Sequence, residues 1–420
     1  MATLCRHHKG ARGDLRIYVL TPGFPPKAGG QEQHLYQLSE SLIAAGASVR
    51  VITHRYERAL AVKEHVGPVP VLRLSPFGTL KGAGFRVVPR LGILLCRMFW
   101  RLLRDRRDYQ AVLVSGYNFM PMSAVLAALL TGKPCVVRPE SPLELTEFVG
   151  ADSRAKMGLS QGGWLLSLLA SLRRRAARRV DRYAAISSEI RVGLERLGID
   201  PARIVPIPNG IDMERFQPVA AERKAQLRRA LGLPVDGTLL IYTGRLAITK
   251  GAMMLIDVWR ELAEFHPSAH LVMVGTGRGS FDSCETELKE FIVQRGLTSR
   301  VTLTGNVANV HEFLQACDLF VFPSDYEGFG LSILEAMAVG LPSVCTRVGV
   351  TMEIPSDVEF GLLVPPKDRD SFRDAVQRLL PDAELRVRMG ESAHAAVHLR
   401  YSLSAEARQY VDLFSGLAGS

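Results

Sequence analysis

The chain has 420 residues, of which 47% are hydrophobic and 22% are charged, and its formal net charge is +10 at pH 7. This composition is typical of a globular protein and excludes a disordered or fibrous chain, and the length predicts two domains rather than one. The positive charge is uneven, because residues 1–212 hold 31 Lys or Arg and 16 Asp or Glu, whereas the remainder holds 21 and 26. An anionic partner is therefore expected to meet the first half of the chain.

The six cysteines are scattered and show no C-x-x-C spacing, which favours a reducing cytosol over a disulfide framework or a zinc site. The first fourteen residues, MATLCRHHKGARGD, lack the apolar segment of a signal peptide. Residues 109–132 carry no formal charge, but Gly116, Tyr117 and Pro121 interrupt them. Strand, turn and helix are therefore expected there rather than a membrane span, and we predict a cytoplasmic protein.

Short aliphatic runs alternate with longer helical patterns along the whole chain, as in parallel α/β units. In the first half, strands are predicted at 15–20, 49–53, 71–74, 111–115, 134–138, 183–187 and 204–207. A turn-rich break follows at PNGIDMERFQP (208–218), and strands resume at 238–244, 270–277, 301–305, 319–324, 342–346 and 361–366. We predict an α/β protein with two Rossmann-like domains, whose parallel sheets face each other across a cleft.

Four loops that follow predicted strands have the features of anion sites. Open parallel sheets bind ligands beyond the carboxyl ends of their strands, and free N–H groups at a helix start attract phosphate. The four loops are PPKAGGQ (25–31), GRLAITKG (244–251), GTGRGS (275–280) and DYEGFG (325–330). GTGRGS matches neither the dinucleotide fingerprint nor a Walker loop. These loops predict a phosphate-bearing donor that is bound by the second half of the chain and capped by the first.

One acid lies in the last of these loops and a second follows it. Glu327 lies just before Gly328-Phe329-Gly330, and Glu335 lies within the apolar run that follows. A buried carboxylate is costly unless it is paired or neutral. From the residues alone, Glu335 is either a ligand-binding acid or a structural acid paired with a neighbour such as Arg347.

In this order, the segments GGQEQHLYQLSESLIAAGASVRVIT, PNGIDMERF, GRLAITKG, LVMVGTG, DLFVFPSDYEGFGLSILEAMAVGLPSV and GLLVPPKD resemble the retaining glycosyltransferases of family 4. That family has the GT-B fold. The resemblance runs from about residue 15 to the end and includes an E-x7-E pair, Glu327 and Glu335. It implies a first domain at 1–212, a nucleotide-sugar domain at 213–398 and a final helix at 399–420 that crosses back to the first domain.

The resemblance also implies a role for each charged residue. Arg245 and Lys250 would clamp the diphosphate of a UDP- or GDP-sugar and stabilise the leaving charge. Glu327 would bind a hydroxyl of the donor sugar, and these three residues are the expected catalytic set. Glu335 would accept hydrogen bonds from the ribose hydroxyls. No metal or other cofactor is expected.

Backbone groups complete the donor site that the resemblance implies. Phe329, Gly330 and Leu331 would line the phosphate and the sugar. Gly30 would offer its N–H to the phosphate from across the cleft, and Gly277 is a further candidate, although its loop can equally be a simple turn.

The chain departs from the family pattern after the strand at 111–115. Many relatives have a histidine there, whereas this chain has Ser115 and Gly116, so no base is assigned. Candidate residues of an acceptor or sugar subsite are Tyr117, Asn118, Arg138 and Glu140. His34 and His54 are expected to be ordinary histidines of the surface or the cleft edge.

The segments 89–107 and 162–182 join apolar and arginine-rich faces. Each is either a peripheral membrane-binding helix or a helix that packs on the core with a basic outer face. Nucleic acid is not expected, because aromatic residues are few and no binding motif is present. The predicted function is sugar transfer to a glycan or lipid-linked acceptor in cell-surface polysaccharide or glycolipid synthesis. The alternatives are a partner subunit that binds nucleotide-sugar without turnover and another GT-B enzyme, such as a nucleotide-sugar epimerase or a phosphorylase.

Overall fold

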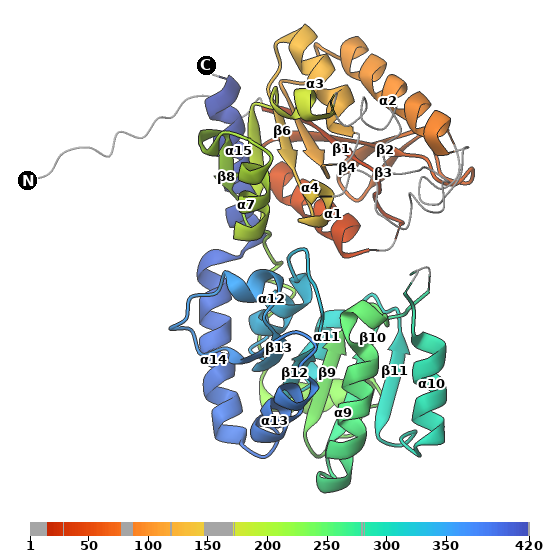
Figure 1. Cartoon of the computed structure of the whole chain (residues 1–420), viewed down its shortest axis with the longest axis vertical. Helices are drawn as coiled ribbons and strands as arrows, with labels where there is room; N and C mark the ends of the chain where they lie inside the picture. Colours follow the sequence, from red (N-terminus) through yellow and green to blue (C-terminus); the bar gives the residue numbers. More distant parts are fainter. Residues whose placement is uncertain are drawn as a thin grey trace, which may run out of the picture. The chain divides into compact units, whose positions relative to one another are not determined.

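The computed structural model describes residues 15–27, 29–76, 87–117, 120–146, 171, 173–278, 280 and 282–418. The chain forms two compact units (Figure 1). The first unit combines Met1–Pro208 with Leu403–Ser420, and the second is Asn209–Ser402.

The first unit contains an eight-stranded sheet with the order β3-β4-β2-β1-β5-β6-β7-β8. Its strands are β1 Arg16–Thr21, β2 Ser48–His54, β3 Lys63–Val66, β4 Val69–Leu74, β5 Ala111–Ser115, β6 Cys135–Arg138, β7 Arg182–Ala185 and β8 Ile204–Pro206. The seven strands predicted in this half are confirmed. The sequence did not predict β3, which pairs antiparallel with β4 at the sheet edge. Its sequence, KEHV, lacks an apolar run because an edge strand needs little burial.

Helices cover both faces of this sheet. They are α1 Gly30–Ala44, α2 Val87–Arg104, α3 Met120–Thr131, α4 Leu143–Thr146, α7 Ser188–Arg196, the 3-10 turn η1 Pro201–Arg203 and α15 Leu403–Ala418. Successive side chains of a strand point to opposite faces. Ile17 and Val19 of β1 pack in the core with α1 and α15, whereas Tyr18 donates a hydrogen bond to Asp105, which follows α2.

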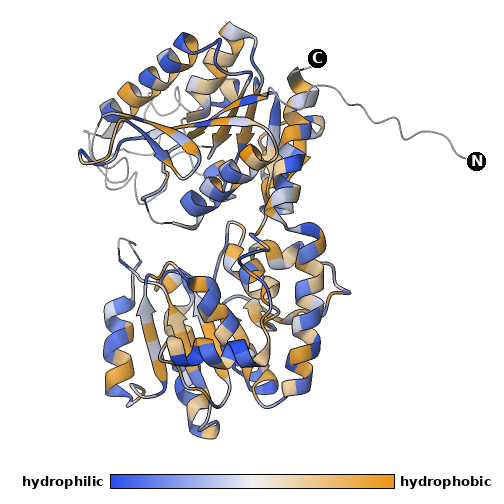
Figure 2. Cartoon of the chain, turned by 180° about the vertical axis from the view of Figure 1, so that it is seen from behind, coloured by the Kyte–Doolittle hydropathy of each residue, from blue (hydrophilic) through white to orange (hydrophobic). Residues whose placement is uncertain are grey.

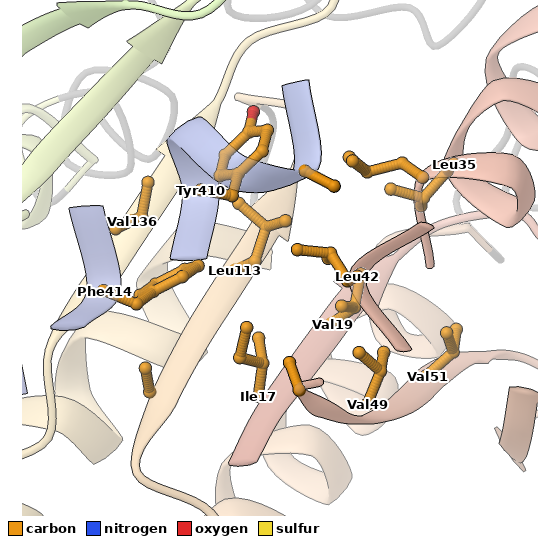
Figure 3. Packing of buried hydrophobic residues seen from close by; sticks show 14 of the residues in the cluster. Ile17, Val19, Leu35, Leu42, Val49, Val51, Leu113, Val136, Tyr410 and Phe414 are labelled. Carbon is orange, nitrogen blue, oxygen red and sulfur yellow. The ribbon is translucent and has the colours of Figure 1, made fainter. Parts of the chain in front are cut away.

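The last helix of the chain completes the core of the first unit. Tyr410 and Phe414 of α15 are fully buried and lie against Leu113 of β5 and the side chains of α1 (Figure 3). Full burial of one such side chain stabilises a fold by about 1.5–3 kcal/mol. Although α15 is last in the sequence, it is therefore an integral part of the first unit.

The second unit contains a six-stranded sheet with the order β11-β10-β9-β12-β13-β14, and all its paired strands are parallel. The strands are β9 Leu239–Thr243, β10 His270–Val274, β11 Val301–Gly305, β12 Leu319–Phe322, β13 Ser343–Thr346 and β14 Gly361–Val364. All six had been predicted from the sequence. Most are apolar without alternation (Figure 2), as expected for strands that helices cover on both faces.

The helices of the second unit connect these strands. They are α8 Ala221–Ala230, η2 Ile248–Lys250, α9 Ala252–Phe265, α10 Glu285–Gln294, α11 Val310–Ala316, α12 Leu331–Ala338, η3 Gly349–Met352, α13 Arg369–Leu379 and α14 Ala383–Arg400. From β9 the chain proceeds through β10 to β11 on one side, and then returns to place β12 on the other side of β9. Such a reversal opens a crevice between the loops after the two strands, which is the usual ligand position in open α/β sheets.

Within the described part of the chain, no helix combines the length and the apolar character that a membrane crossing requires. The inner face of α2 packs on the core, because Leu94, Met98 and Leu102 are completely buried. The core-packing interpretation of this face is therefore confirmed, and membrane binding by the segment 89–107 stays a prediction. The segment 162–182 lies mostly outside the described residues.

Candidate functional site

The loops that follow β9 and β12 are locked together at the crevice of the second unit. The Asp325 N–H donates to the Thr249 carbonyl at 2.9 Å. Gly251 begins α9 in a left-handed conformation with φ 69°, and a Cβ there would lie 2.0 Å from the Pro323 carbonyl oxygen. Only glycine tolerates both this conformation and this approach. The side chains of the two loops are consequently held close together.

Lys250 and Glu327 form an ion pair at this contact. The Lys250 Nζ lies 2.6 Å from a carboxylate oxygen of Glu327, and it also approaches the Tyr326 carbonyl at 3.4 Å. Both side chains are largely buried. The pair therefore fixes an ammonium and a carboxylate at the carboxyl end of the sheet, although the two residues are 77 positions apart.

Arg245 follows β9 and presents its guanidinium at the same edge. Its side chain is 54% exposed, and its Nη1 donates to the Ser280 hydroxyl at 2.7 Å and lies 3.8 Å from Asp282. Burial disfavours the charged form of Asp282, but hydrogen bonds from Ser280 and Thr249 outweigh it and lower the pKa of Asp282 to about 2. An ionised Asp282 thus orients a guanidinium that is still accessible to a bidentate anion.

Helix α12 begins at this crevice without a side-chain cap. Its N-cap, Gly330, is left-handed with φ 95°, and no side chain of a described residue caps the first N–H groups. The Phe329 carbonyl accepts from the Val350 N–H at 2.6 Å, which anchors the preceding loop. Uncapped N–H groups and the positive end of a helix dipole favour an anion at this position. The predicted helix start near Gly330 is confirmed.

Glu335 lies one turn further along α12 and is half-buried. Desolvation raises the pKa of its carboxyl to about 7, and Arg215 only partly opposes this. No hydrogen bond or ion pair is found for its carboxylate among the described residues, and the alternative ion pair with Arg347 does not form. A carboxylate that is desolvated and has no partner among the described residues is suited to accept hydrogen bonds from a ligand.

Two glycines of the predicted site have different surroundings. The Gly277 N–H donates to Glu285 at 2.7 Å, and a Cβ at Gly277 would lie 2.6 Å from the Leu246 carbonyl. Hydrogen bonds from Lys289, Thr276 and Gly277 lower the pKa of Glu285 to about 2. The Gly277 N–H therefore already has an acceptor at the start of α10. Gly30 is exposed as the first residue of α1 in the first unit, and a Cβ there would meet no atom of the described residues within 4 Å.

A buried polar network lies at the carboxyl ends of β5 and β6 in the first unit. Arg138 donates to Glu140 at 2.7 Å and to the His34 Nδ1 at 3.1 Å, and the Ser115 hydroxyl donates to the same Glu140 carboxylate. The His34 Nε2 lies 3.0 Å from Glu406 of α15. The network joins α1, β5, β6 and α15.

The prediction that His34 and His54 lie at the surface or the cleft edge is wrong. Both side chains are at most 3% exposed. His34 is buried because Arg138 and Glu406 satisfy its two ring nitrogens, and the His54 Nε2 lies 2.7 Å from the Pro76 carbonyl. Burial lowers the pKa of His54.

One of the two remaining acceptor candidates, Tyr117, lies beside this network. Tyr117 is buried, its ring lies 4.6 Å from the Arg173 guanidinium, and its N–H donates to Glu144 at 2.8 Å. Asn118 lies outside the described residues. Glu144 is a further buried acid that the sequence does not predict, and its pKa is raised to about 7 by burial and by the neighbouring Glu140. No motif marks Glu144, because only the fold places its carboxylate beneath the loop after β5.

Within the described ranges, no group of three or more His, Cys, Asp or Glu side chains could hold a metal ion.

Two family models match consecutive parts of the chain. "Glycosyltransferase Family 4" matches residues 28–215, and "Glycosyl transferases group 1" matches residues 223–396. The chain belongs to glycosyltransferase family 4. The resemblance that the sequence motifs carried is thereby confirmed.

Curated relatives of this family 4 chain transfer different sugars. An alpha-D-kanosaminyltransferase of Streptomyces kanamyceticus is 33% identical over 246 residues, which are 57% of this chain and 62% of the relative. A lipopolysaccharide core biosynthesis mannosyltransferase of Rhizobium meliloti is 31% identical over 223 residues, which are 51% of this chain and 63% of the relative. The chain thus spans less than two thirds of the length of these relatives.

Solved structures share the fold of this family 4 chain over nearly its whole length. Sucrose-phosphate synthase from Thermosynechococcus elongatus matches with a TM-score of 0.77 at 23% identity, and covers 97% of this chain and 100% of its own. Anabaena HepE in complex with UDP-glucose matches with a TM-score of 0.72 at 20% identity, over 96% and 100% of the two chains. The predicted GT-B architecture of two Rossmann-like units is confirmed.

Proposed function

We propose that this protein is a retaining glycosyltransferase that moves a sugar from a UDP- or GDP-sugar to a glycan or lipid-linked acceptor in cell-surface polysaccharide or glycolipid synthesis. One observation carries the proposal. Arg245, Lys250, Glu327 and the uncapped start of α12 meet where the strand order of the second sheet reverses, with the unpaired Glu335 one turn away. Two cations and a helix N-terminus suit a diphosphate, and two carboxylates suit hydroxyl groups.

The proposed chemistry follows from where charge develops. Breaking the anomeric C–O bond leaves positive charge on the sugar and negative charge on the departing diphosphate. Arg245, Lys250 and the α12 dipole stabilise the diphosphate, and each such preorganised donor is worth roughly 3–4 kcal/mol of transition-state stabilisation. Glu327 orients the donor sugar through a hydroxyl group. Lys250, whose Nζ lies 2.6 Å from the Glu327 carboxylate, compensates the charge of this largely buried side chain.

Glu335 accepts hydrogen bonds from the two ribose hydroxyls in this scheme. Ribose binding supplies two donors to a carboxylate that has no other partner among the described residues. Charge-assisted hydrogen bonds of this kind contribute about 1.5–3 kcal/mol each. Binding of the nucleotide therefore offsets the desolvation cost of Glu335. The backbone of Phe329, Gly330 and Leu331 lines the phosphate and the sugar.

Acceptor activation needs no histidine in this scheme, because the departing phosphate takes the acceptor proton on the same face of the sugar. The polar groups around Arg138 and Glu140 shape the acceptor or sugar subsite, and the role of Gly30 in phosphate binding stays a prediction. The relatives support the substrate classes. One of them is a lipopolysaccharide core mannosyltransferase, and Anabaena HepE binds UDP-glucose.

Slow donor hydrolysis without an acceptor tests this proposal. The purified protein is incubated with UDP-, GDP- and ADP-sugars, and release of the nucleoside diphosphate is measured. One donor is expected to be cleaved, and Lys250→Ala should lower the rate by about 100-fold or more. The exposed Arg229→Ala of α8 is the control and should leave the rate unchanged. Tight donor binding with no cleavage, even with acceptor extracts added, would instead favour a partner subunit without turnover.

A further inference from the structure

The loop between β10 and α10 packs against the loop after β9, which carries both cations of the donor crevice. The Ile248 N–H donates to the Asp282 carbonyl at 2.9 Å. Ala247 and Ser283 form an antiparallel β-bridge between the two loops. These backbone contacts hold Asp282 beside residues 245–250.

The two carboxylate oxygens of Asp282 contact different parts of the loop after β9. Its Oδ1 lies 3.8 Å from the Arg245 Nη1. The same oxygen accepts from the Ser280 hydroxyl at 2.6 Å, and that hydroxyl accepts from Arg245 at 2.7 Å. Its Oδ2 accepts from the Thr249 N–H at 3.3 Å and from the Thr249 hydroxyl. Since Thr249 directly precedes Lys250, one carboxylate contacts Arg245 on one side and the turn that carries Lys250 on the other.

These contacts orient the side chain of Arg245, whose backbone is anchored separately. The Tyr242 hydroxyl donates to the Arg245 carbonyl at 2.7 Å. Among the described residues, Asp282 is the acid with which Arg245 forms an ion pair, and the Asp282 side chain is 8% exposed. A ligand can therefore reach the exposed guanidinium, whereas the buried acid acts on a ligand through its neighbours. An arginine that is already held in place loses less rotamer freedom when it binds an anion.

We propose that Asp282 is a positioning residue of the donor site, which holds Arg245 and the turn before Lys250 so that both cations meet the same diphosphate. The proposal rests on the proposed function, because the diphosphate belongs to the nucleotide-sugar. A solely structural acid would stabilise the two loops and would affect all parts of the ligand alike. A positioning acid affects the part of the ligand that the two cations bind.

Comparison of a nucleoside diphosphate with its nucleoside tests the proposal. UDP and GDP are titrated into the full chain and into Asp282→Asn by calorimetry, and the binding of uridine and guanosine is measured by ligand-observed NMR. Asp282→Asn removes the charge and keeps the size of the side chain. It should weaken binding of the diphosphate by roughly tenfold, which is the loss of about one charge-assisted hydrogen bond. Affinity for the nucleoside should change by less than about twofold, because the nucleoside lacks the diphosphate.

Asp318→Asn is the matched control. Asp318 is also a largely buried acid of the second unit, and it pairs with Lys224 and Arg228 at 2.6 Å. It precedes β12 and so lies at the amino end of the sheet, away from the donor crevice. The control should lower the melting temperature and leave the ratio of the two affinities unchanged.

The outcomes separate this proposal from the proposed function. If the wild type binds a diphosphate, equal weakening of diphosphate and nucleoside in a folded Asp282→Asn variant would overturn the positioning role. Unchanged affinity for the diphosphate would overturn it as well. Failure of both diphosphates to bind the folded wild type would instead contradict the donor site of the proposed function, and the positioning role would fall with it.

Discussion

Replacing Glu335 with glutamine distinguishes two effects of its carboxylate: destabilisation of the folded protein and binding of the nucleotide-sugar. Desolvation raises the pKa of Glu335 from an ordinary 4.5 to about 7. At 1.36 kcal/mol per pKa unit, this shift corresponds to about 3 kcal/mol, which partial exposure reduces to roughly 2 kcal/mol. Since the folded pKa is the higher one, the folded state of the wild type binds more protons than the unfolded state between these two values. The wild type therefore loses stability as the pH rises from 4.5 to 7.

Glu335→Gln should consequently unfold at a higher temperature than the wild type at pH 8, and at nearly the same temperature at pH 5. For a unit of the size of Asn209–Ser402, a gain of about 2 kcal/mol raises the melting temperature by roughly 4–8 °C. Differential scanning calorimetry at the two pH values measures this difference. The neighbouring Ser332→Ala, on a partly exposed position of the same helix, is the control and should show no pH-dependent gain.

The same substitution should weaken nucleotide-sugar binding by roughly tenfold at pH 8, because an amide accepts hydrogen bonds less strongly than a carboxylate. A gain in stability combined with a loss of affinity is the mark of a functional acid. Destabilisation at pH 8, or an equal shift at both pH values, would refute the reasoning that Glu335 is an unpaired, desolvated carboxylate.

Three further substitutions test the close contact at Gly251, the ion pair of Lys250 and the polar network of the first unit. Gly251→Ala should lower the free energy of unfolding by more than about 2 kcal/mol in urea titrations, because the left-handed backbone and the close carbonyl exclude a Cβ; no loss would contradict this. Lys250→Ala should lower the free energy of unfolding by about 2–4 kcal/mol, because it removes the partner of Glu327. The double variant Lys250→Ala/Glu327→Ala should be less destabilised than the sum of the two single variants, whereas strictly additive losses would contradict the ion pair. Glu406→Ala should lower the free energy of unfolding, measured by thermal unfolding, by about 3 kcal/mol, because the buried His34 loses its carboxylate partner. A change under about 0.5 kcal/mol would show that α15 packs on the first unit without help from the polar network.

The strands and the donor loops could be predicted because their sequence signals are local. A continuous apolar run such as HLVMV predicts a buried parallel strand, and glycines beside Glu327 and Lys250 predict a loop that admits a ligand. The ordered motifs then placed both residues in one family pattern. The Lys250–Glu327 contact itself depends on the packing of two loops across the strand-order reversal, which no local pattern specifies.

The polar network of the first unit could not be predicted for the same reason. His34 is a polar residue on an amphipathic helix, and nothing in its neighbourhood indicates that α15, more than 370 positions later, supplies Glu406. Burial of His34 and Arg138 is acceptable only because these distant partners satisfy them. The outer face of α2 was likewise hidden, since its leucines dominated the sequence pattern while Trp100 and Ile93 proved to be the exposed residues.

Calorimetric titration of UDP-, GDP- and ADP-sugars into the wild-type chain, Arg245→Ala and Glu335→Ala tests the central claim most directly. One nucleotide-sugar is expected to bind the wild type with micromolar affinity, and each substitution should weaken this binding by roughly tenfold or more. Failure of every donor to bind the folded wild-type chain, or unchanged affinity in both variants, would contradict the assignment of the donor site.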